Sequence, residues 1–228
     1  MGKNTLQWLG HSTFLVNTAR GTKILIDPWI TGNPACPVEK EDLSALDIIL
    51  ITHDHGDHMG EDVPFFASTG DPEILVQPEV LAKLSADGVE GGTGMNIGGT
   101  ATARGVEVTM VQAHHSSGVG SPCGYIITTE DGKKVYHAGD TGIFATMGTL
   151  GDLYELDVAL LPTGSHFVMD DRQAAHAVEL LRPKTAIPMH FGTFPVLTET
   201  ADEFVRLVEQ GGSGAKTKVL RPGDEMEF

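Results

Sequence analysis

Short apolar runs separated by turn-forming residues dominate the pattern along the chain. The runs at 23–26, 47–51 and 157–161 are too short for helices, and they predict buried strands. Residues 106–111 alternate between apolar and polar positions, which is typical of a half-buried strand. Other segments with strand-like patterns are 6–9, 13–16, 74–76, 124–128, 134–137, 185–189, 218–220 and 226–228.

Apolar residues at helical spacing predict helices over 78–86, 170–181 and 199–208, with a shorter helix within 60–70. The glycine-rich passage 90–100 is expected to be a turn before a second sheet. Strands come first and mixed helix and strand follow, and this order occurs twice. The pattern indicates one α/β (α+β) domain over residues 1–228, built from two related halves.

Composition fits this picture. A chain of 228 residues with 40% hydrophobic residues can form one ordinary core. Cys36 and Cys123 are far apart and form no metal or redox motif, so we interpret them as ordinary thiols. No stretch reaches the roughly 18 apolar residues that a membrane span needs. The first residues lack a secretory signal, so we expect a cytoplasmic protein that does not enter a membrane.

The net charge limits the classes of molecule that the protein is expected to bind. Lys plus Arg number 15 and Asp plus Glu number 31, giving a net charge of −16. This field repels polyanions, whereas proteins that grip nucleic acid through its phosphates usually present a basic face. We therefore expect a small-molecule substrate rather than nucleic acid. The sequence leaves a homo-oligomer open.

One polar stretch interrupts the apolar pattern directly after the strand at 47–51. Residues 52–58 read Thr-His-Asp-His-Gly-Asp-His and offer four metal ligands, His53, His55, Asp57 and His58. A loop can turn all four inward, whereas a helix cannot because ligands two residues apart face different directions. Imidazole with carboxylate suits Zn, Mn or Fe. Four ligands exceed what one catalytic ion needs, so we predict two adjacent metal ions.

Single histidines and carboxylates recur where other predicted strands end. Because carboxyl ends of strands are where sites are usually built, these residues are candidates for the same site. They are Asp27 after 23–26, His114 and His115 after 106–111, Asp140 after 134–137, His166 after 157–161 and His190 after 185–189, with His11 in the first turn.

The stretch 53–58 resembles the HxHxDH signature of the metallo-β-lactamase superfamily. Nearly the whole chain is similar to the UPF0173 metal-dependent hydrolases. The resemblance implies a four-layer αββα sandwich, with two mixed β-sheets flanked by helices and the site at one edge of the sheets. The other matching pieces are Gly10-His11-Ser12, Ile26-Asp27-Pro28, Thr31-Gly32-Asn33-Pro34, His115-Ser116-Ser117, His137-Ala138-Gly139-Asp140-Thr141 and Pro188-Met189-His190.

The resemblance also implies a ligand set for two divalent ions, with zinc expected and manganese or iron as alternatives. The first ion takes His53, His55 and His115, the second takes Asp57, His58 and His190, and Asp140 bridges them. A hydroxide held between the ions is the expected nucleophile.

Four residues have further expected roles at this site. Asp57 is expected to steer the nucleophile, and Asp27 to bond the ligand loop without touching metal. His11 is expected on the substrate side, and His11 or His166 is the expected proton donor.

The third histidine ligand is ambiguous in the sequence. Strand alternation extended from Val106, Val108 and Met110 favours His114. The resemblance favours His115, which directly precedes Ser116-Ser117. We predict His115, because strands often bulge or end beside a site and their phase is least reliable there.

The predicted function is hydrolysis of a small ester, lactone, amide or phosphodiester. The alternatives are a phosphodiesterase or nuclease of the same fold, and a metal-dependent binding protein without turnover. Di-iron oxidoreductases of this fold typically have Glu at the position of His55 and a flavin partner domain, for which this chain has no room.

Overall fold

Two mixed β-sheets pack face to face in the computed structural model, which describes residues 2–43 and 45–228. Residues 1 and 44, included in the predicted domain 1–228, lie outside this description. The first sheet is antiparallel from β14 to β3 and parallel from β3 to β6. Its order is β14 (Glu225–Glu227), β1 (Thr5–Trp8), β2 (Phe14–Asn17), β3 (Lys23–Ile26), β4 (Ile48–Leu50), β5 (Glu73–Val76) and β6 (Thr93–Gly94).

The second sheet has the same plan. It is parallel from β13 to β10 and antiparallel from β10 to β7. Its order is β13 (Lys216–Thr217), β12 (Thr185–Met189), β11 (Val158–Pro162), β10 (Lys134–His137), β9 (Cys123–Thr128), β8 (Val106–Gln112) and β7 (Thr100–Ala103).

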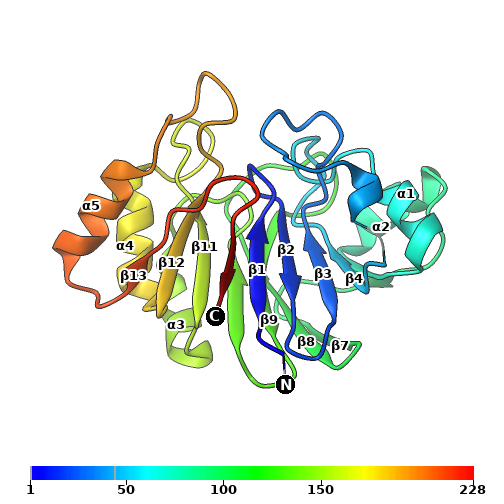
Figure 1. Cartoon of the computed structure of the whole chain (residues 1–228), viewed down its shortest axis with the longest axis horizontal. Helices are drawn as coiled ribbons and strands as arrows, with labels where there is room; N and C mark the ends of the chain where they lie inside the picture. Colours follow the sequence, from blue (N-terminus) through cyan, green and yellow to red (C-terminus); the bar gives the residue numbers. More distant parts are fainter. Residues whose placement is uncertain (1, 44) are drawn as a thin grey trace.

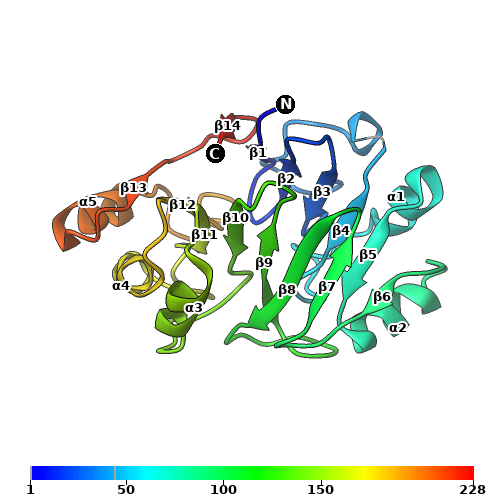
Figure 2. The ribbon, with the colours of Figure 1, turned by 90° about the horizontal axis from the view of Figure 1, so that it is seen from below.

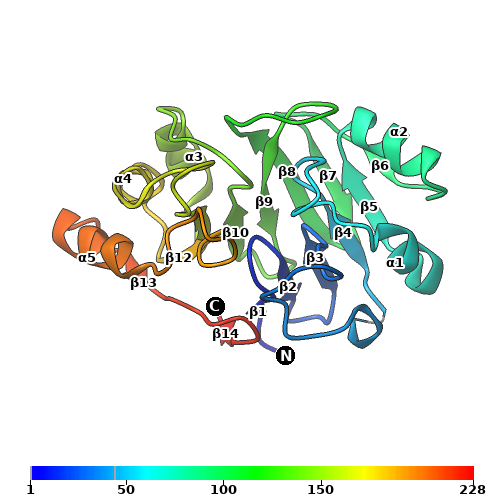
Figure 3. The ribbon, with the colours of Figure 1, turned by 90° about the horizontal axis from the view of Figure 1, so that it is seen from above.

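Helices cover both outer faces, so the layers follow the order helix, sheet, sheet, helix (Figures 2 and 3). Helices α1 (Val63–Gly70) and α2 (Pro78–Ala86) lie outside the first sheet. Helices α3 (Met147–Tyr154), α4 (Asp171–Leu181) and α5 (Asp202–Gly211) lie outside the second. This is the predicted four-layer αββα sandwich, and the prediction is confirmed. In the described part of the chain, none of these helices has the length and apolar character to span a bilayer.

Several segments differ from the predicted elements. Strand β7 was not predicted, the strand predicted over 218–220 lies instead at Lys216–Thr217, and the helix predicted over 199–208 begins and ends three residues later. Helix α3 was not predicted, because Gly148 and Gly151 interrupt its apolar pattern. Gly151 is needed there, since a Cβ would lie 2.6 Å from the carbonyl oxygens of Leu180 and Leu181 in α4. The predicted turn over 90–100 also contains Thr93–Gly94, which extends the first sheet by pairing with Leu75 and Val76.

The interior between the sheets is apolar, and a few hydrogen bonds join the two sheets near one end. The Tyr125 hydroxyl on β9 donates to the carbonyl oxygens of Ile51 (2.8 Å) and Leu75 (3.1 Å) in the first sheet. His137, fully buried at the end of β10, bonds the Ser12 carbonyl at 2.9 Å. Loops after β3 and β12 rise at the same end of the molecule (Figure 1). These ties fix the two sheets against each other where the ligand-bearing loops begin.

Candidate metal centre

The loop after β4 turns back on itself at once. The backbone N–H groups of His58 and Met59 both donate to the His55 carbonyl, at 3.1 and 2.9 Å. This tight turn brings the side chains of His53, Asp57 and His58 toward one region. The central β4 strand is fully buried, so the start of the loop has a fixed position.

The first cluster joins His53 and His55 of this loop to His115 of the loop after β8. Their ligand-type atoms all lie within 4.8 Å of one another. His53 Nε2 is 3.0 Å from His55 Nδ1, and the His115 ring stands edge-on to both at 5.2 Å between centroids. The structure thus brings together the three histidines predicted for the first ion.

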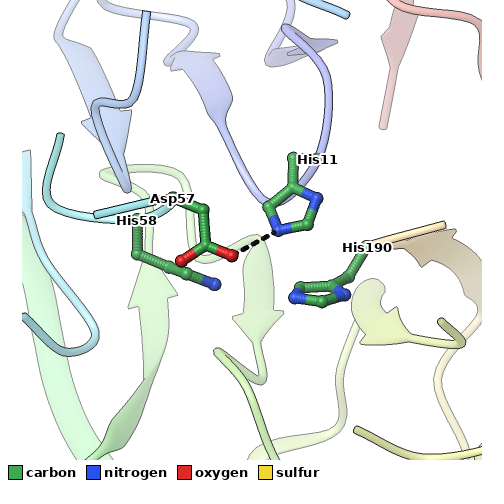
Figure 4. A group of neighbouring side chains, drawn as sticks. All are labelled: His11, Asp57, His58 and His190. Carbon is green, nitrogen blue, oxygen red and sulfur yellow. Dashed lines mark hydrogen bonds and ion pairs between the residues drawn. The ribbon is translucent and has the colours of Figure 1, made fainter. Parts of the chain in front are cut away.

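The second cluster contains Asp57, His58 and His190, the set predicted for the second ion, together with His11. Figure 4 shows the four side chains converging from three separate loops. His11 Nε2 donates to Asp57 Oδ2 at 3.2 Å, and the His11 and His190 rings lie 3.9 Å apart. His11 was predicted as a substrate-side group and a candidate proton donor, and its direct contact with the Asp57 carboxylate was not predicted.

Asp140 lies between the two clusters. Its Oδ1 is 3.2 Å from His58 Nε2, and its Oδ2 is 3.0 Å from His190 Nε2. The same Oδ2 is 3.5 Å from His115 Nε2, which belongs to the first cluster. One carboxylate therefore reaches both sets, as a bridging ligand must.

Several buried ligand-type atoms here lack hydrogen-bond partners. Among the described residues these include His58 Nε2, Asp140 Oδ1 and both ring nitrogens of His190. A buried polar atom without a partner costs about 1–3 kcal/mol, so folded proteins rarely keep several together. Their convergence, with nitrogen and carboxylate donors, fits divalent metal ions.

Asp27 fixes the histidines from behind. It is fully buried at the end of β3 and accepts from the Thr52 N–H and hydroxyl, each at 2.8 Å, and from His58 Nδ1 at 2.7 Å. Since the Thr52 hydroxyl donates to Asp27, its oxygen accepts from His53 Nδ1 at 3.0 Å. Both rings consequently direct Nε2 into the site, the usual arrangement of a metal-binding histidine.

The clustered histidines and aspartates shift one another's pKa values. Burial disfavours the charged form of His58, but the carboxylates of Asp140 and Asp27 outweigh it and hold the His58 pKa well above its ordinary value. Burial would raise the pKa of Asp140, yet His58 and His190 keep it well below the usual range. Burial lowers the pKa of His53 to about 3 and that of His11 to about 4. Neutral His53 is the form that binds metal.

Three site residues adopt left-handed backbone conformations. His11, Asp27 and His190 have φ angles of 53°, 49° and 59°. Such conformations are uncommon for residues with a Cβ and cluster at functional sites, where the surroundings enforce them. The His190 N–H donates to the His11 carbonyl at 3.1 Å, which ties these two turns together.

A cavity of about 270 Å³ opens onto the clusters. Sequence reasoning did not predict two of its lining residues, Ser116 and Phe167. The predicted proton donor His166 does not line it; its ring is exposed and stands edge-on to Phe167. The turn closed by the Val168 N–H on the Ser165 carbonyl directs Phe167 to the cavity. A catalytic role for His166 therefore gains no support from the geometry.

The structure also separates the two adjacent histidines. His115 points at Asp140, whereas His114 is exposed and stacks on Phe144 with ring centroids 5.0 Å apart. The strand phase failed because β8 ends at Gln112, before either histidine.

We expect His115→Ala to lose most affinity for one ion, and His114→Ala to keep both ions. Metal content at limiting metal concentration compares the two variants. Loss of metal in His114→Ala alone would reverse the assignment.

Comparison with known proteins gives consistent matches. The model of the β-lactamase superfamily domain matches residues 22–191. A UPF0173 metal-dependent hydrolase of Koribacter versatilis is 46% identical, covering 90% of this chain and 91% of its own. One of Methanopyrus kandleri is 42% identical, covering 97% and 99%. The solved structure of Igni18, a metallo hydrolase of the archaeon Ignicoccus hospitalis, is 41% identical with a TM-score of 0.91, covering 99% and 98%.

Proposed function

The chain belongs to the UPF0173 metal-dependent hydrolases of the β-lactamase superfamily, and from this premise we propose that it is a dinuclear enzyme acting on a small ester, lactone, amide or phosphodiester. The observation that carries the dinuclear proposal is the position of Asp140 between two complete ligand clusters. We expect zinc in both positions, with manganese or iron as alternatives.

Two bound divalent ions would supply an acidified water and polarise the substrate oxygen. Asp140 would hold the ions together, and His53, His55 and His115 would complete one set while Asp57, His58 and His190 complete the other. Asp57 also accepts from His11 Nε2, which fixes the orientation of its carboxylate. His11 Nδ1 in turn meets the Thr193 hydroxyl at 3.0 Å. His11 therefore links Asp57 to the loop after β12. Its side chain is fully buried and does not line the cavity, so the expected role as proton donor gains no support from the geometry either.

The cavity supports a small substrate. Its volume of about 270 Å³ lies at or just below the small end of ligand pockets, which run from about 300 Å³. Exposed Phe167 offers one apolar contact and Ser116 one hydroxyl. The net charge of −16 opposes a nucleic-acid substrate. We also propose that the protein acts in the cytoplasm.

A substrate panel tests the hydrolase proposal. Metal-loaded protein is offered chromogenic carboxylic esters, lactones, anilides and phosphodiesters, each with a chelated sample as the control. We expect turnover of at least one class that disappears on chelation and returns with metal. If metal-saturated protein hydrolyses no substrate class faster than the chelated control does, the result would favour a binding protein. Hydrolysis of phosphodiesters alone would favour the phosphodiesterase alternative.

A further inference from the structure

Asp54 lies inside the ligand stretch but points away from both clusters. Its side chain is only 5% exposed and accepts from Lys83 Nζ of α2 at 2.8 Å. It also accepts from the backbone N–H group of Gly118 at 2.6 Å. A buried carboxylate of the first sheet's loop thus holds the loop that follows β8 in the second sheet.

That second loop carries His115, which makes no hydrogen bond of its own among the described contacts apart from its 3.5 Å approach to Asp140. Its backbone is instead fixed on both sides. The His114 N–H donates to the Thr141 hydroxyl at 2.9 Å, and Gly118, three residues after His115, donates to Asp54. The Gly142 N–H also donates to the His114 carbonyl at 3.0 Å, so the position of the His115 ring relative to His53 depends on contacts at His114 and on the bond from Gly118 to Asp54.

Gly118 shows how closely the two loops approach. A Cβ at this position would lie 2.7 Å from Asp54 Oδ2, which is closer than real contacts allow. The φ angle of Gly118 is not in the left-handed region, so only this contact opposes a side chain. The neighbouring Ser121 N–H donates to Gln77 Oε1 at 2.5 Å, which adds a further tie from the residue before α2.

We propose that Asp54 is a positioning residue for the first metal ion: by holding the N–H group of Gly118, it sets His115 against His53 and His55. This inference rests on the proposed metal site. Groups that orient metal ligands typically contribute 10–100-fold to affinity. The second cluster, which receives no residue from this loop, should be affected much less.

The test is a cobalt titration followed by visible absorption and calorimetry. Asp54→Ala should weaken one of the two binding steps by roughly 10–100-fold and leave the other within about threefold. Gly118→Ala should weaken the same step, because its methyl group pushes the Asp54 carboxylate away. In the Asp54→Ala background, Gly118→Ala should add almost nothing, since the opposing carboxylate is gone.

Asp157→Ala is the matched structural control. Asp157 is also buried and accepts from two lysines, Lys133 and Lys184, and from the Lys134 N–H. It lies at the amino ends of β10 and β11, whereas the metal centre lies at their carboxyl ends. Asp157→Ala should lower the melting temperature as Asp54→Ala does, yet leave both binding steps unchanged. Equal binding by Asp54→Ala and wild type would overturn this proposal alone. A wild type that binds no cobalt would overturn it together with the metal site.

Discussion

Asp140→Asn should reduce metal-dependent activity by more than ~100-fold, beyond the usual effect of a residue that only orients a ligand. Among residues 2–43 and 45–228, Asp140 is the one carboxylate whose oxygens lie within 3.5 Å of His58, His115 and His190. An amide has nearly the same shape but no charge, so it cannot bridge two cations as a carboxylate does. The loss should appear in metal content as well as in rate.

The same substitution should leave the metal-free protein nearly as stable as wild type. The amide fits the same space, and without its charge His58 can remain neutral. Thermal melts of both proteins in excess chelator make this comparison. A large drop in melting temperature for chelated Asp140→Asn would instead identify Asp140 as a structural turn residue.

Asp27→Asn should lower the affinity for both metal ions by roughly 10–100-fold, although Asp27 is not expected to contact either ion. Its carboxylate accepts from His58 Nδ1 and, through the Thr52 hydroxyl, holds His53 as well. An amide can present N–H to His58 Nδ1, which would place the ring proton on Nε2 and block metal binding. Loss of the Asp27 carboxylate should therefore affect both ions, whereas loss of Asp54 should affect only one.

Asp62→Asn provides the control for this substitution. Asp62 is also fully buried and accepts from the N–H and hydroxyl of one threonine, Thr31, and from a cationic partner, Lys40. Metal titrations and the ring-nitrogen NMR shifts of the histidines distinguish the Asp27→Asn and Asp62→Asn variants. If Asp27→Asn bound both ions like wild type, the role assigned to the Asp27–His58 bond would be wrong.

The strands and most ligand positions could be predicted because buried strands have a strong local signal. The short apolar run at β4 and the histidines and carboxylates directly after it can be read from the order of residues alone. Asp140 and His190 also follow predicted strands, and parallel strands bring such ends together. The choice of His115 needed the family resemblance, since strand phase pointed to His114.

Other features depend on contacts that no local pattern records. Helix α3 needs glycine at 151 because α4 packs against its backbone. Phe167 reaches the cavity through the turn at Ser165, a non-glycine residue with a φ of 68°. The role inferred for Asp54 depends on a loop 64 residues later in the chain.

Metal stoichiometry tests the central claim most directly. Metal-free protein, titrated with zinc and freed of excess by gel filtration, is analysed for metal alongside His115→Ala and His190→Ala. We predict about two equivalents in wild type and about one in each variant, because each histidine belongs to a different ligand set. Saturation of the wild type at a single equivalent would contradict the dinuclear site.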